Sequence, residues 1–249
     1  MKNKENLNLR DKIGVKLQNN IVFKIGEIIL VFISAFVLIK LLNPLVGDNP
    51  ILKQAVVWIA NILMLFIVFT GIKLRGESWK DFGLTFNSIS WKDGGKVFLL
   101  SLLVFALAVA GFIIGSIIMA NITGIPETSN MSGYDYLKDN IGMLLLTLGG
   151  VYIVSSFGEE VIYRAFLINR ISQIGLDTKT GGIIAIILSA IIFGFAHYEW
   201  GPMGIAQTGF MGLALGICYV KLKKRLWILI LAHAYMDTIL MVQMYLASN

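Results

Sequence analysis

The sequence predicts an all-α membrane protein, a polytopic transmembrane helix bundle of about seven spans. Of the 249 residues, 57% are hydrophobic and only 14% are charged, and the mean hydropathy is +0.77. A soluble domain contains about 25% charged residues, and one globular core of this size has no room for so much apolar surface. A bilayer supplies the apolar surroundings that these residues need.

Seven apolar runs approach the roughly 20 residues that a helix needs to cross the hydrocarbon layer of a membrane. We expect them at residues 22–42, 55–72, 94–120, 142–171, 181–199, 203–221 and 226–246. The first run follows a charged leader and has no small-residue cleavage site after it, so we expect an uncleaved span. Its Glu27 is expected to reach the membrane interface or to form an ion pair there, close to Lys24.

Basic residues lie mostly at one end of these spans and therefore predict their orientation. With residues 1–21 in the cytoplasm, the outer segments hold only Lys40, Lys53 and Lys138, and the outer segment 121–140 is net acidic. We therefore expect a multi-pass protein of the cell membrane with a cytoplasmic N-terminus. The abundance of Lys, Asn and Ile is typical of a low-GC bacterium.

Several other classes of protein are disfavoured. The net charge of +6 does not indicate a nucleic-acid partner, because the charges lie at the ends of apolar runs. The single cysteine, Cys218, excludes a disulfide framework and a Cys-based metal site. Residues 73–93 mix aromatic and charged side chains, which is typical of an interfacial segment at the inner leaflet or of a polar loop with aromatic anchors.

Six ionisable residues interrupt the fourth, fifth and seventh runs. Placing a charged group in the hydrocarbon layer costs free energy, so each of these residues calls for a structural or functional explanation. Glu160 and Arg164 are four residues apart, so they share a helix face and can form an ion pair. Glu159 points about 100° away from Glu160, towards a different neighbour. The full set comprises Glu159, Glu160, Arg164, His197, His233 and Asp237, and it includes both histidines of the chain.

Helix geometry brings these groups within reach of one another near the middle of the membrane, counting about 1.5 Å per residue from the span ends. Each group also has a structural explanation by itself. A buried histidine is usually a core residue that forms hydrogen bonds and has no catalytic role. The pair Glu160–Arg164 can be an ion pair that fixes helix packing, and the pair His233–Asp237 can stabilise its own helix. Their joint occurrence at one depth favours a shared site.

Three short motifs on these runs resemble those of a known family. They are Glu159-Glu160-Val161-Ile162-Tyr163-Arg164, Phe193-Gly194-Phe195-Ala196-His197 and His233-Ala234-Tyr235-Met236-Asp237. They are similar to the Glu-Glu-x-x-x-Arg, Phe-x-x-x-His and His-x-x-x-Asn/Asp motifs of the CPBP intramembrane proteases, also called the CAAX-protease and bacteriocin-processing or Abi family. The resemblance covers about residues 142–240. It implies three N-terminal helices (22–120) followed by a CPBP-like catalytic helix bundle (142–246).

The resemblance implies a role for each motif residue. Glu159 would act with His197 to activate a water molecule, and Glu160 and Arg164 would hold the site in shape. His233 and residue 237 would stabilise the oxyanion or complete a metal site. Asp237 stands where the family often has Asn. An ionised Asp does not donate a hydrogen bond but is a good metal ligand, so the cofactor is left open between a divalent ion such as zinc and none. Asn is a poor ligand, which favours the metal-free mechanism.

The implied activity is that of an intramembrane endopeptidase, glutamate- or metal-dependent, acting on a membrane-associated peptide or protein. Peptide maturation and bacteriocin immunity fit a bacterial sequence better than prenyl-protein cleavage. The residues themselves agree, because a carboxylate and a neutral imidazole can deprotonate water. Two alternatives stay open. One is a non-catalytic peptide-binding or immunity protein of the same fold. The other is a proton-coupled transporter, for which we find neither inverted repeats nor broken helices in the sequence.

Overall fold

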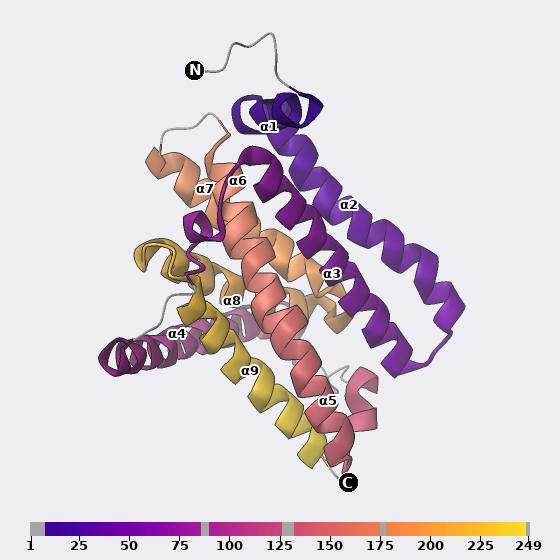
Figure 1. Ribbon diagram of the computed structural model, residues 1–249. Coiled ribbons are helices and arrows are strands. Elements are labelled where there is room, and N and C mark those ends of the chain that lie inside the picture. Colours follow the sequence, from indigo (N-terminus) through magenta and orange to yellow (C-terminus); the bar gives the residue numbers. More distant parts are fainter. Residues whose placement is uncertain (1–7, 86–89, 126–131, 175–177, 248–249) are drawn as a thin grey trace.

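The computed structural model describes residues 8–85, 90–125, 132–174 and 178–247, and within them it contains helices and no strand. Seven helical spans are long and apolar enough to cross a membrane, which confirms the predicted fold class. The spans are α2 (Ile21–Val46), α3 (Pro50–Arg75), α4 (Trp91–Thr123), a fourth span from Ile141 to Ser172, α7 (Thr178–Ala196), α8 (Gly201–Lys221) and α9 (Leu226–Leu246). The fourth span runs through the middle of the bundle (Figure 1).

The second span is longer than expected because local capping signals fix both of its ends. The Asn49 side chain accepts a hydrogen bond from the Leu52 amide at 3.1 Å, and Pro50 occupies the first helical position. Proline suits that position because its missing N–H would be unpaired there in any residue. At the other end, Gly76 adopts a left-handed conformation with φ of 69°, which terminates the helix.

The segment before the first span also forms a helix, α1 (Leu9–Asn19), although residues 1–7 lie outside the described part of the chain. The helix crosses the ends of α2 and α3 (Figure 1). Gly14 permits this close approach, because a Cβ atom at that position would collide with the carbonyl oxygen of Leu74. The N-terminal segment therefore packs on the bundle.

The expected interfacial segment, residues 73–93, is described except for residues 86–89. Its short 3₁₀ turn η2 (Trp79–Phe82) is followed by Leu84, and both Phe82 and Leu84 are buried in the main core. Trp91, by contrast, is 98% exposed at the start of α4. The aromatic residues of this segment thus divide between the protein core and the surface.

Glu127, one of the acidic residues of the expected outer segment 121–140, lies outside the described residues.

Glu27 forms ion pairs with residues that are far away in the sequence. Its carboxylate pairs with Arg75 at the end of α3 and with Arg170 in α6 (Asn169–Ser172), the latter at 2.6 Å. Lys24, the expected neighbour, instead donates to the Gln173 carbonyl at 2.9 Å. The carboxylate of the first span is therefore buried in a network that joins it to the second and fourth spans.

The fourth span is not a uniform α-helix. It begins as α5 (Ile141–Val151), widens into the π-helical segments η4 (Tyr152–Phe157) and η5 (Glu160–Ile168), and closes in α6. Every residue of η5 is buried, and the segment contacts α3, α7, α8 and α9. Glu159 lies at the junction between η4 and η5 and keeps α-helical dihedral angles, with φ of −68° and ψ of −38°, so its expected separation of about 100° from Glu160 stays a prediction.

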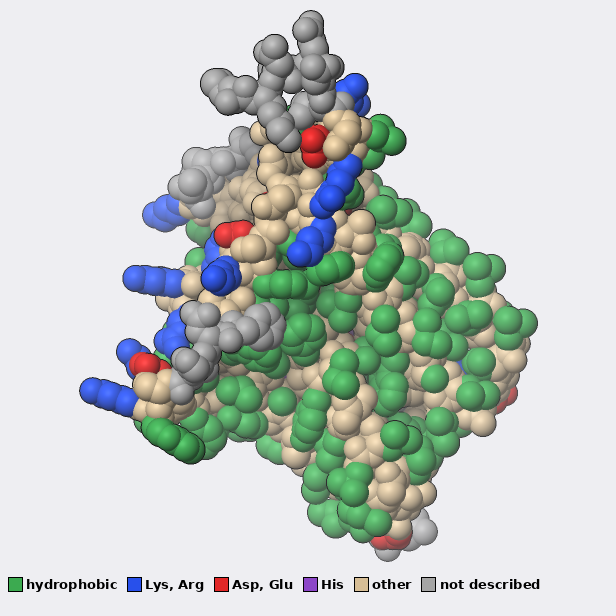
Figure 2. Space-filling model, in the orientation of Figure 1, with side chains coloured by type: hydrophobic (Ala, Val, Ile, Leu, Met, Phe, Trp, Pro, Cys, Tyr) green, Lys and Arg blue, Asp and Glu red, His purple; other side chains and the backbone are tan. Residues whose placement is uncertain are grey.

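The surface separates charged and apolar side chains. Lys and Arg gather along one side of the molecule, whereas most of the remaining visible face is hydrophobic (Figure 2). Large apolar side chains are exposed on the outer helices, including Leu30 and Phe36 on α2 and Ile117 on α4. Soluble monomers rarely expose such continuous apolar surface, which fits a multi-pass membrane protein.

Candidate active site

His233, on α9, lies at the centre of the predicted site. Its Nδ1 atom lies 2.8 Å from the Oε1 atom of Glu160, and both side chains are almost completely buried. Its Nε2 atom lies between two further carboxylates, 3.9 Å from Glu159 Oε2 and 3.8 Å from Asp237 Oδ1. When Glu160 is ionised it only accepts, so Nδ1 donates the hydrogen of the short contact. The fourth and seventh spans thus bring four of the predicted residues together.

Arg164 lies behind this group. Its Nη1 atom lies 3.0 Å from Glu160 Oε1, so the predicted ion pair is confirmed. The guanidinium also packs over the Phe193 ring, with its carbon 4.3 Å from the ring centroid. Its nitrogen atoms have no aligned hydrogen-bond partner among the described residues. The contact between Arg164 and Glu160 is therefore mainly electrostatic.

Asp237 has a partner that the sequence analysis missed. The Ser156 hydroxyl, in η4, donates to Asp237 Oδ2 at 2.6 Å and is completely buried. The two adjacent serines, Ser155 and Ser156, which interrupt an apolar run just before Glu159, were the available signal. Through this bond the fourth span orients the Asp237 carboxylate as well as the His233 imidazole.

His197 lies at a helix end and not inside the fifth span, which was expected to continue to residue 199. Helix α7 ends at Ala196, and the 3₁₀ turn η6 (Tyr198–Trp200) follows His197. The aromatic residues of this turn continue the apolar pattern of the sequence, and for this reason the predicted span was too long. The chain nevertheless reverses there, because Gly201 adopts φ of 73° and the following proline opens α8.

Local contacts fix the orientation of the His197 ring. Its Nδ1 atom lies 2.9 Å from the Phe193 carbonyl oxygen, and its ring centroid lies 4.9 Å from those of Phe193 and Trp200. Neither a hydrogen bond nor an ion pair joins His197 to Glu159 within the described chain. The two residues instead line the same cavity.

This cavity has a volume of about 790 Å³, within the usual range for ligand sites. Four of the six predicted residues line it, namely Glu159, His197, His233 and Asp237, whereas Glu160 and Arg164 do not. The first three spans also line the cavity, and they include the amides Gln54 and Asn61 on α3. The predicted set therefore divides into four residues that reach the cavity and two that support them.

Tyr134, in the 3₁₀ turn η3 (Ser132–Leu137), lines the cavity and was also missed by the sequence analysis. Burial raises the pKa of its phenol, and nearby carboxylates raise this pKa further. The hydroxyl therefore stays neutral and can donate a hydrogen bond into the cavity. No local pattern marks this tyrosine, because it precedes the fourth span by sequence and reaches the site only through the fold.

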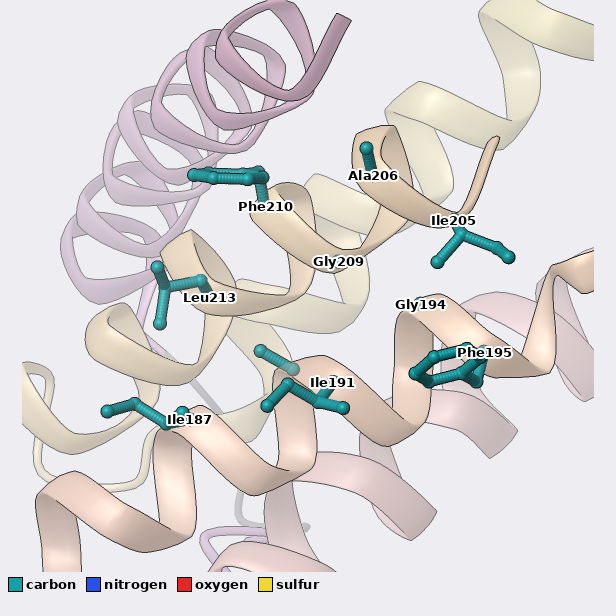
Figure 3. Close-up of a pocket in the computed structure, with 10 residues that line it drawn as sticks. Ile187, Ile191, Gly194, Phe195, Ile205, Ala206, Gly209, Phe210 and Leu213 are labelled. Carbon is teal, nitrogen blue, oxygen red and sulfur yellow. The ribbon is translucent and has the colours of Figure 1, made fainter. Parts of the chain in front are cut away.

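A smaller hollow of about 270 Å³ lies between α7 and α8 (Figure 3). Ile187, Ile191 and Phe195 line it from α7, and Phe210 and Leu213 line it from α8. It contains no ionisable side chain, so it offers no chemistry for hydrolysis.

A catalytic metal site usually has three protein ligands around one ion. No group of three or more His, Cys, Asp or Glu side chains is arranged to hold one within the described residues. The Nδ1 atom of His233 is engaged by Glu160, and its Nε2 atom faces Glu159 and Asp237. The choice between the metal-free and the metal-dependent mechanism therefore rests on a measurement of the protein's metal content.

Comparison with known proteins identifies one family. Residues 141–239 match the family model described as type II CAAX prenyl endopeptidase Rce1-like, a segment that contains all three motifs. The match confirms the resemblance to the CPBP family and supports a membrane endopeptidase. No curated protein and no solved structure shows significant similarity to the chain.

Proposed function

We propose that this protein, whose residues 141–239 match the Rce1-like CAAX prenyl endopeptidases, hydrolyses a peptide bond of a membrane-associated peptide or protein. The observation that carries the proposal is the state of the Glu159 carboxylate. Its Oε2 atom is buried and has no hydrogen-bond partner among the described residues, yet Glu159 lines the cavity. Buried polar atoms are rarely left unpaired, so a water molecule is expected there.

His197 supplies a second acceptor for this water. A carbonyl oxygen only accepts hydrogen bonds, so the contact with Phe193 assigns the ring hydrogen to Nδ1 and leaves the Nε2 lone pair free. In the proposed reaction, Glu159 and His197 hold the water and Glu159 removes its proton. The water oxygen then attacks the scissile carbonyl carbon. When the C–N bond breaks, the proton passes to the leaving amine nitrogen.

The tetrahedral intermediate carries a negative oxygen that needs a hydrogen-bond donor. We propose His233 as this donor, through Nε2 when the ring carries both hydrogens. Asp237 contributes only in its protonated form, because an ionised carboxylate does not donate. Glu160 and Arg164 are positioning residues. They lie behind the cavity wall and fix the His233 ring through the 2.8 Å contact.

The substrate is proposed to approach from the non-cytoplasmic side. Tyr134, from the segment expected outside, lines the cavity, and the basic side chains gather along one side of the molecule (Figure 2). The positive-inside rule then gives a cytoplasmic N-terminus in the cell membrane, in a bacterial cell. Peptide maturation or bacteriocin immunity is the proposed biological setting.

The experiment compares peptides released from membranes that contain wild-type protein or the Glu159→Ala variant. Asp48→Ala is the control, since it removes an exposed carboxylate that does not line the cavity. We expect cleavage products with wild-type and Asp48→Ala protein and none with Glu159→Ala protein of equal abundance. Identical products from all three would overturn the proposal. Peptide binding without cleavage would favour a binding protein, and proton-dependent uptake into vesicles would favour a transporter.

A further inference from the structure

The charged side chains that line the cavity are acidic, apart from His233 when its ring carries both hydrogens. Three carboxylates line it, those of Glu159, Glu199 and Asp237, whereas no Lys or Arg is among its described lining residues. Arg164 is only 1% exposed and is neutralised by Glu160. A cavity with walls of low polarity focuses the field of such groups, so it attracts cations and repels anions.

Glu199 is the carboxylate that the proposed reaction does not use. It is exposed on η6, two residues after His197. It has no ion pair among the described residues, and its one hydrogen bond there is a 3.4 Å contact from the Tyr198 hydroxyl. The carboxylate is therefore available to a ligand in the cavity.

The turn that bears Glu199 is held firmly against the site. The Trp200 ring packs on His197, with 4.9 Å between the ring centroids. Gly204, at the start of α8, leaves room for this indole, because a Cβ atom there would collide with the Trp200 side chain. The backbone of Glu199 is thus held two residues from His197, so its carboxylate stays on the part of the cavity wall next to this proposed catalytic residue.

We propose that Glu199 selects substrates that carry a positive charge, a Lys or Arg side chain or a free amino terminus, within a few residues of the scissile bond. The proposal rests on the proposed function and names its substrate class. The amides Gln54 and Asn61, which also line the cavity, are neutral and suit any peptide backbone. Glu199 is the lining residue that can distinguish substrates by charge without taking part in the chemistry.

The test uses a sequence cleaved by wild-type membranes, made as three quenched fluorescent peptides that carry Lys, Gln or Glu at the basic position. We expect wild-type protein to prefer the Lys peptide by about five- to tenfold in kcat/KM, mainly through KM. Glu199→Gln should abolish this preference, and Glu199→Lys should reverse it in favour of a peptide with Glu. Asp135→Asn, an outer carboxylate in an exposed pair with Lys138, is the control and should keep the preference.

Three outcomes would overturn the inference: cleaved sequences without a positive charge, no preference in the wild-type protein, or a preference retained by a Glu199→Gln variant with wild-type melting temperature. Each leaves the proposed function intact, because cleavage still depends on Glu159. If no peptide is cleaved in a Glu159-dependent way, the proposed function fails and this inference fails with it.

Discussion

The Nδ1 atom of His233 lies 2.8 Å from the Oε1 atom of Glu160, so this buried contact joins the seventh span to the fourth. Arg164 approaches the same carboxylate oxygen from the other side at 3.0 Å. The imidazole is thereby held with its second nitrogen between Glu159 and Asp237. The reactive groups thus depend on residues that do not reach the cavity.

This contact predicts different effects for its two partners. His233→Ala removes the proposed donor to the oxyanion and should abolish cleavage, a loss of about 10²–10³ or more in kcat. Glu160→Gln keeps a hydrogen-bond acceptor but removes the charge, and should lower kcat less. Initial rates of both variants, at equal membrane insertion, check this order. A more severe loss in Glu160→Gln would contradict it.

Arg164→Ala should lower stability as well as activity. The substitution leaves the Glu160 carboxylate buried without its cation, and breaking a buried pair in this way costs about 3–5 kcal/mol. The measurement is thermal unfolding in detergent, with Glu160→Gln/Arg164→Met as the matched double variant. The double variant should recover part of the lost stability, because no unpaired charge remains. An unchanged melting temperature in Arg164→Ala would show that the pair contributes nothing.

His197→Ala should separate activity from stability. The ring lies at a helix end and is only partly buried, so its removal should change melting little. Cleavage should nevertheless fall by about 10²–10⁴, because the water loses one of its two acceptors. Parallel rate and melting measurements with Arg164→Ala provide the contrast. Normal cleavage by His197→Ala would remove this residue from the mechanism.

Asp237→Asn distinguishes the metal-free mechanism from a metal-dependent one. Asn donates a hydrogen bond without needing a proton, so the metal-free mechanism predicts equal or higher activity near neutral pH. A metal site would instead lose a charged oxygen ligand, and activity would fall. Metal content per protein, measured together with the activity of both forms, decides the question. Stoichiometric zinc combined with an inactive Asp237→Asn variant would falsify the metal-free mechanism.

Glu27→Ala should destabilise the protein although Glu27 is remote from the cavity. The change leaves Arg170 buried without its carboxylate, whereas Arg75 keeps its pair with Glu77, and breaking a buried pair in this way costs about 3–5 kcal/mol. Asp48→Ala, which breaks an exposed pair with Lys53, should cost less than about 1 kcal/mol and is the control. Equal melting temperatures for the two variants would contradict the proposed role of the network.

The sequence sufficed to predict the seven spans, because hydropathy and length decide membrane crossing. It also predicted which ionisable residues meet, since Glu160 with Arg164 and His233 with Asp237 are near in the chain. Contacts between distant segments were not predictable in this way. The bond from Ser156 to Asp237 and the pairing of Glu27 with Arg170 arise only when spans pack. The helix end before His197 was missed because an aromatic turn continues the apolar pattern.

The wide turns of the fourth span have a consequence for how this chain tolerates insertions and deletions. A π-turn accommodates one more residue than an α-turn between bonded groups. Deleting one residue from η4 would restore an α-turn. The span would stay just as apolar, so an assay of membrane integration would not reveal the deletion. The deletion would nevertheless rotate Glu159 relative to α5 and move Ser156 away from Asp237. The geometry of the site therefore depends on the length of this stretch, which a count of its apolar residues does not reveal.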